Sequence, residues 1–126
     1  MNTPSKRAAS APAKPAQSKP FIRFYHSQRL RAKTLAAIEA VENTEDASAH
    51  APALAEVLVE LLNGAMDYFF MRPLKLAKVN FIVLQSASIG MAATQQLVGT
   101  LTRSVIARMN TPQLVSLCGS LRRFME

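Results

Sequence analysis

The side chains most able to do chemistry are few in this sequence and lie far apart. The chain holds two histidines, His26 and His50, and one cysteine, Cys118. The histidines form no HExxH motif and no ligand pair at helical spacing, so no metal site is expected. One cysteine cannot form a disulfide within the chain, and Cys118 on an apolar helix face is expected to be inert packing. We therefore predict no metal and no cofactor.

Three acidic residues, Glu56, Glu60 and Asp67, lie on one stripe of a predicted helix. The helices of di-iron bundles carry such acids, but they also need Glu-x-x-His motifs and matching acids on other helices. Those partners are missing from the sequence. We interpret the stripe as solvated, or as paired with Lys75, Lys78 or the first predicted helix.

The sequence around Pro73 offers the one polar cluster that an enzyme could use. It would combine the side chains of Asp67, Tyr68, Arg72 and Asn80. No glycine-rich phosphate loop, nucleophile elbow or catalytic triad can be assembled from the chain. We assign no catalytic residue and predict that the protein is not an enzyme.

A segment that mixes basic and aromatic residues extends from Lys19 to Lys33. Its basic residues are Lys19, Arg23, Arg29, Arg31 and Lys33, and they alternate with the aromatic residues Phe21, Phe24 and Tyr25. Such a mixture is typical of contacts with polyanions, either the phosphates of nucleic acid or an anionic membrane surface. The third interpretation is that the aromatic rings pack inward while the basic side chains stay solvated. We favour this third interpretation and keep the two binding modes as alternatives.

Small residues form a stripe within the long uncharged stretch from Val79 to Thr102. Ser86, Gly90 and Thr94 follow one another at spacings of four, so one side of the predicted helix is nearly smooth and a neighbouring backbone can approach it. A helix that is apolar on more than one side is buried, packed in an oligomer or in lipid. We favour burial in the centre of the domain, because the glutamines and Asn80 would lack partners in lipid.

Composition and periodicity predict an all-α protein. Trp is absent and there are 4 glycines, while Ala, Leu, Val and Met dominate the apolar residues, which suits helix packing. We expect a disordered basic tail over residues 1–19 and one helical domain over 20–126. Apolar periodicity and proline positions predict a four-helix bundle-like domain with one long central helix, its helices at 21–42, 52–71, 73–109 and 112–125.

Charges are separated by sign along the chain. There are eight bases and no acid up to Lys33, seven acids and no base from Glu39 to Asp67, and seven bases and no acid from Arg72 to Arg123. The acidic block is therefore the natural neighbour of one of the basic blocks within the folded chain.

These features favour a non-enzymatic helical assembly or adaptor protein that contacts itself or another helical protein. One alternative is a peripheral binder whose basic tail and first helix attach to an anionic membrane or a hydrophobic inclusion. Another is nucleic-acid binding through the same segment. The basic start lacks the apolar region of a secretory signal, so we expect a cytoplasmic protein, at most peripheral to a membrane, with organelle targeting as the alternative.

Overall fold

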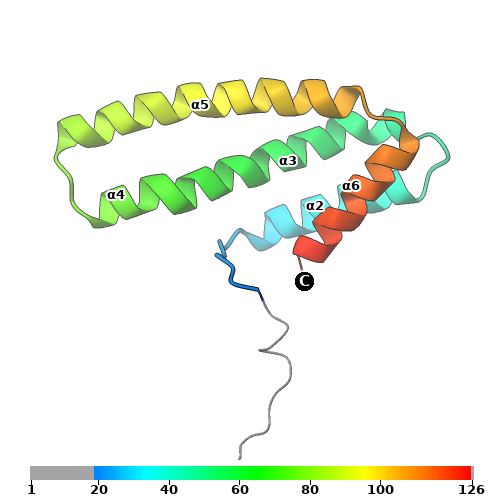
Figure 1. Cartoon of the computed structure of the whole chain (residues 1–126), viewed down its shortest axis with the longest axis horizontal. Coiled ribbons are helices and arrows are strands. Elements are labelled where there is room, and N and C mark those ends of the chain that lie inside the picture. Colours follow the sequence, from blue (N-terminus) through cyan, green and yellow to red (C-terminus); the bar gives the residue numbers. More distant parts are fainter. Residues whose placement is uncertain (1–18, 126) are drawn as a thin grey trace, which may run out of the picture.

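The computed structural model describes residues 19–125, and all regular secondary structure in this part of the chain is helical (Figure 1). The all-α prediction is confirmed. The predicted tail, residues 1–19, lies outside the described residues apart from Lys19. The elements are α2 (Gln28–Glu42), η1 (Ala47–His50), α3 (Ala51–Met66), η2 (Asp67–Met71), α4 (Arg72–Leu76), α5 (Phe81–Ala107) and α6 (Thr111–Phe124).

Two long helical rods run antiparallel and form a hairpin (Figure 1). The first rod is α3, η2 and α4 in unbroken succession, and the second is α5, whose 27 residues span about 40 Å at about 1.5 Å per residue. Helices α2 and α6 pack against each other and α2 also packs on α3, so they form a small bundle at one end of the hairpin. The turn between α4 and α5 lies at the other end, which we name the tip.

Pro73 does not end the first rod, although its sequence position predicts that it should. The five residues before Arg72 form a π-helical turn, in which the amide of Arg72 donates to the carbonyl of Asp67. In a regular α-helix the ring of a proline collides with the carbonyl four residues earlier, and a π-helical turn inserts the extra residue that relieves this contact. The helix therefore continues through Pro73 to Leu76, beyond the predicted end at residue 71.

The chain reverses at residues 77–80 instead. Lys78 has a φ of 57°, the left-handed geometry that ends many helices. Asn80 then caps α5, because its side chain accepts a hydrogen bond from the amide of Val83 at 2.9 Å. The long helix predicted at 73–109 is consequently shorter, from Phe81 to Ala107, and it runs without a break through both of its glycines.

The first helix also begins later than the predicted residue 21. Ser27 is its N-cap and accepts a hydrogen bond from the amide of Leu30 at 3.0 Å, which fixes the start of α2 at Gln28. Residues 19–27 have no regular structure. The ring of Phe24 nevertheless packs against those of Tyr68 and Phe69, with centroids 6.3 and 6.1 Å apart, so part of this segment folds back onto the hairpin.

The hydrophobic core lies where α2, α6, the start of α3 and the end of α5 meet. Its fully buried side chains include Ile38, Leu54 and Leu114. Helix α5 contributes only Gly99 and Ile106 to the buried residues. The expectation of a buried central helix is therefore corrected, because a hairpin longer than the bundle leaves most of α5 with one neighbour rather than several.

Ion pairs join the acidic block to both basic blocks of the sequence. The prediction was pairing with one of them. The pairs are Lys33 with Glu60 at 2.5 Å, Arg103 with Glu56 at 2.7 Å, and Arg122 with Glu42 at 2.6 Å. All six side chains are partly exposed, so solvent screens the pairs and each contributes little to stability. Their main consequence is to fix which elements lie side by side.

Candidate functional site

Helix α5 presents two apolar sides. The residues that face α3 are partly or fully buried, and they recur at spacings of three and four: Leu84, Ala87, Met91, Gln95, Val98, Thr102 and Ile106. The opposite side is exposed, and we name it the outer face: Ile82, Ser86, Ile89, Gly90, Ala93, Thr94, Leu97 and Leu101. Helix α5 therefore has one apolar side that packs on α3 and another that the rest of the described chain leaves uncovered.

The outer face exposes large aliphatic side chains. Ile82 is 74% exposed, Leu97 is 71% exposed, and Ile89 and Leu101 are exposed to a similar degree. Within the described residues, α5 is the one helix that is long and apolar enough to cross a membrane by length and composition, and no residue of its most apolar 18-residue window is buried. Exposure of this extent is unusual for an uncharged helix surface and points to an interaction site.

The small-residue stripe lies in the middle of the outer face. Ser86, Gly90 and Thr94 are all exposed, and the Thr94 hydroxyl donates to the Gly90 carbonyl at 2.9 Å, so its polarity is satisfied within the helix. A Cβ built at Gly90 meets no atom within 4 Å. No contact among residues 19–125 therefore requires glycine there.

Gly99 on the same helix differs from Gly90. It is buried, and a Cβ there would lie 3.1 Å from Nη1 of Arg103 and 3.7 Å from Cγ1 of Val59. The tight contact at Gly99 is thus with the Arg103 side chain of the same helix, while Val59 of α3 would lie at an ordinary contact distance; Gly90 has neither neighbour.

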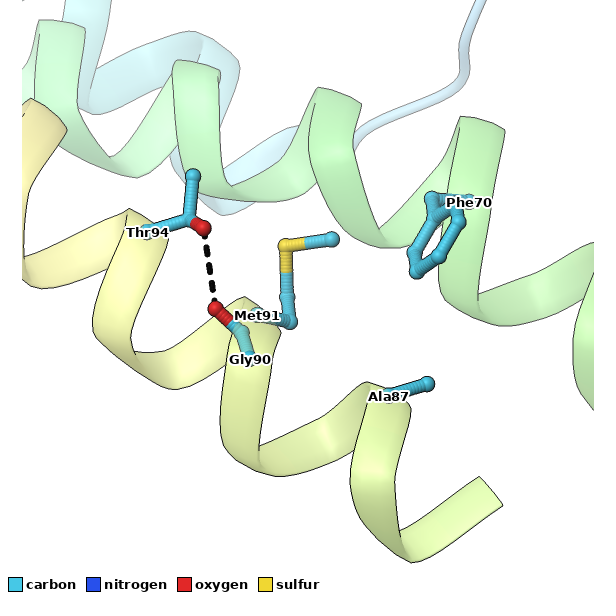
Figure 2. A pocket seen from close by; sticks show the side chains of 5 residues that line it. All are labelled: Phe70, Ala87, Gly90, Met91 and Thr94. Atoms are coloured by element: carbon cyan, nitrogen blue, oxygen red, sulfur yellow. Dashed lines mark hydrogen bonds between the residues drawn. The ribbon is translucent and has the colours of Figure 1, made fainter. Parts of the chain in front are cut away.

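An open depression of about 320 Å³ borders the outer face (Figure 2). It is lined by Phe70, Ala87, Gly90, Met91 and Thr94, and Figure 2 shows the ring of Phe70 reaching from the first rod toward α5. The lining is apolar apart from the Thr94 hydroxyl, which is already hydrogen bonded. The depression can therefore accept an apolar side chain. Phe70 could not be assigned to it from the sequence, because π-helical geometry changes the side on which residues 67–71 lie.

The predicted polyanion residues do not lie together on one helix. Lys19 and Arg23 belong to the irregular segment 19–27, and Arg23 stacks on the ring of Phe21 at 4.5 Å. Arg29 is exposed near the start of α2. On the same helix, Arg31 donates to the Met125 carbonyl at 3.1 Å, and Lys33 pairs with Glu60. The fold therefore uses part of this basic group for its own contacts.

The residues with reactive groups remain apart. In the described part of the chain, residues 19–125, no group of three His, Cys, Asp or Glu side chains could hold a metal ion. Burial raises the pKa of the Cys118 thiol to about 11, so little of it is the reactive thiolate. Of the polar residues considered around Pro73, Arg72 lies over the ring of Tyr68, while the Asn80 side chain caps α5.

The candidate site is therefore the outer face of α5 with its adjoining depression. It holds packing surface rather than reactive groups. Comparisons of this chain with protein-family models, curated proteins and solved structures find no match to any of them.

Proposed function

We propose that this protein is a non-enzymatic helical assembly protein that associates with a second copy of itself through the outer face of α5. The observation that supports this most is the complete exposure of an uncharged helix side that bears Ile82, Ile89, Leu97 and Leu101. Burying these side chains against a partner would remove apolar surface from water at about 25 cal/mol per Å².

The shape of the outer face suits contact between two helices. Gly90 and its small neighbours form a smooth centre, and the longer aliphatic residues lie toward both ends of it. Two identical helices that cross at the smooth centre would each place their aliphatic side chains beside those of the other, as a two-fold interface requires. The depression beside Phe70 would receive one of them.

The outer face is one side of α5 alone, about 40 Å long and about 10 Å wide. It therefore offers about 400 Å² per copy, so an interface of the size typical of stable complexes would also use the adjoining depression beside Phe70. No charge would be buried along the uncharged part of α5, so association would avoid the desolvation of ions.

The basic segment supports the two alternative functions less well. Attachment to an anionic surface or to nucleic acid requires unpaired bases on one side of an element. Here the segment begins as irregular chain, and Arg31 and Lys33 are engaged within the fold.

Light scattering over a range of protein concentrations tests the proposal. The wild-type chain should form a dimer or larger oligomer as concentration rises, and Gly90→Leu should shift the population toward monomer. Gly119→Leu on α6 is the matched control, because a Cβ at Gly119 also meets no atom within 4 Å. It adds the same side chain to a half-buried position on another helix and should leave the oligomer unchanged.

A wild-type chain that stays monomeric up to high micromolar concentration would refute the proposal. Equal effects of the two glycine substitutions would also refute it, because they would show that association does not use the outer face.

A further inference from the structure

The tip of the hairpin exposes apolar side chains that lie far from the bundle. Leu76 is 77% exposed at the end of α4, and Phe81 and Ile82 are each 74% exposed at the start of α5. Figure 1 shows the connection between these helices at the end of the molecule opposite α6. No other element of the described chain reaches the tip to cover these side chains.

Positive charge accompanies the apolar residues at the tip. Arg72, Lys75 and Lys78 are exposed, and the ion pairs found among residues 19–125 involve none of them. The sequence has no acidic residue from 68 to 125, so neither α4 nor α5 carries a carboxylate side chain. The tip is therefore both apolar and cationic.

We propose that the tip binds an anionic lipid bilayer by inserting its apolar side chains among the headgroups. Leu76, Phe81 and Ile82 would reach the boundary of the acyl chains, while Lys75 and Lys78 would contact anionic headgroups. This combination fits a lipid surface better than nucleic acid, because nucleic acid offers phosphates but no apolar layer for Leu76 and Ile82. It fits the tip better than the basic segment, where two bases are already bound within the fold.

The depth of insertion is limited by the charges on the first rod. Asp67 lies on the same rod as Leu76, and Glu60 lies further along it. Both acids would have to leave water if the whole hairpin entered the bilayer, and intramembrane carboxylates are costly. The tip therefore binds at the surface and does not span the membrane.

Vesicle flotation of the full-length chain tests this inference. Wild type should float with vesicles of phosphatidylcholine and phosphatidylserine, and much less with phosphatidylcholine alone. Lys75→Gln with Lys78→Asn should weaken binding about 30-fold, because each base near an anionic surface contributes about a fivefold change. Asparagine at position 78 tolerates the left-handed backbone of Lys78.

Two further pairs of substitutions serve as the apolar test and the charge control. Leu76→Ser with Ile82→Ser should weaken binding at least about tenfold, since apolar insertion is lost while the net charge stays the same. Arg108→Gln with Arg123→Gln removes the same charge from exposed positions away from the tip, and it should leave binding within about twofold of wild type.

The possible results separate this inference from self-association. Because Ile82 belongs to both surfaces, Gly90→Leu is the variant that separates them: lipid binding that persists in it supports a tip that binds lipid without self-association. No flotation of wild type, equal loss in the tip and control charge pairs, or full binding by the Leu76 and Ile82 variant would each overturn the inference. Any of those results leaves the proposed assembly function unaffected, because the oligomeric state is measured without lipid.

Discussion

Replacing Gly90 with alanine should stabilise the monomer. Glycine in a helix interior costs about 1 kcal/mol relative to alanine, because the unfolded chain loses more backbone freedom on folding. At Gly90 no atom lies within 4 Å of the added Cβ, so no steric term opposes this gain. The expected effect of Gly90→Ala is therefore an increase of about 1 kcal/mol in the free energy of unfolding.

Gly99→Ala is the matched comparison on the same helix. The propensity gain is identical, but the new Cβ would lie 3.1 Å from the guanidinium of Arg103, which is held by hydrogen bonds of 2.7 and 3.1 Å to Glu56. Moving that group weakens the exposed ion pair between Arg103 and Glu56, which opposes the propensity gain. The two effects nearly cancel, so Gly99→Ala should change the stability little.

Thermal unfolding at the lowest measurable protein concentration provides the assay, since association would itself raise the apparent stability. Gly90→Ala should raise the melting temperature by about 4 to 8 °C, whereas Gly99→Ala should not. A lower melting temperature for Gly90→Ala would refute the reasoning, because it would mean that another part of the same chain packs on Gly90. Equal increases for both variants would refute the close contact at Gly99.

Three further predictions concern the rest of the fold. Leu54→Ala should lower the free energy of unfolding in urea by about 2 to 5 kcal/mol, because Leu54 is fully buried, whereas Leu62→Ala at a 39% exposed site should cost well under half as much. The hydrogen bond from Arg103 lowers the pKa of the Glu56 carboxyl below its ordinary value of 4.5. This pair therefore stabilises the fold above pH 4.5, and the stabilisation is lost as the pH falls through the folded-state pKa. Acid titration of Arg103→Gln should lack this part of the pH dependence of stability. Cys118 should resist thiol reagents at mildly alkaline pH until the protein unfolds, because it is buried and its pKa is about 11.

Each of these predictions has a result that would contradict it. Equal losses for the two leucine variants would place Leu54 outside the core. An unchanged acid titration in Arg103→Gln would show that Glu56 owes its lowered pKa to another group. Rapid labelling of folded Cys118 would show that α6 opens readily.

Local signals predicted the helices but not all of their ends. The predicted break between residues 109 and 112 matches the end of α5 at Ala107 and the start of α6 at Thr111, where a capping box joins Asn110 and Gln113. Pro73 misled the prediction because a π-helical turn can absorb a proline, and nothing in the residue types before it reveals that turn. Asn80, rather than Pro73, marks the start of α5. An N-cap residue is hard to recognise in a sequence because its role depends on the residues that follow it.

The surroundings of the uncharged stretch could not be read from composition. Its two apolar sides predict two neighbours, and one of these is α3. We expected the other neighbour within the chain as well. Whether the chain supplies it depends on how long the hairpin is relative to the small bundle, and this length is set by where the chain turns. The small-residue stripe was identified from spacing alone, whereas the contribution of Phe70 beside it required the structure.

Cysteine cross-linking on α5 tests most directly whether the outer face joins two copies. Ala92 and Ala93 are adjacent and both exposed, but they lie about 100° apart around the helix, so only Ala93 shares the side of Ile89 and Leu97. Buried Cys118 would not compete in mild oxidation. Packing through the outer face predicts a disulfide-linked dimer for Ala93→Cys and little for Ala92→Cys; equal cross-linking of both variants, or more with Ala92→Cys, would contradict it.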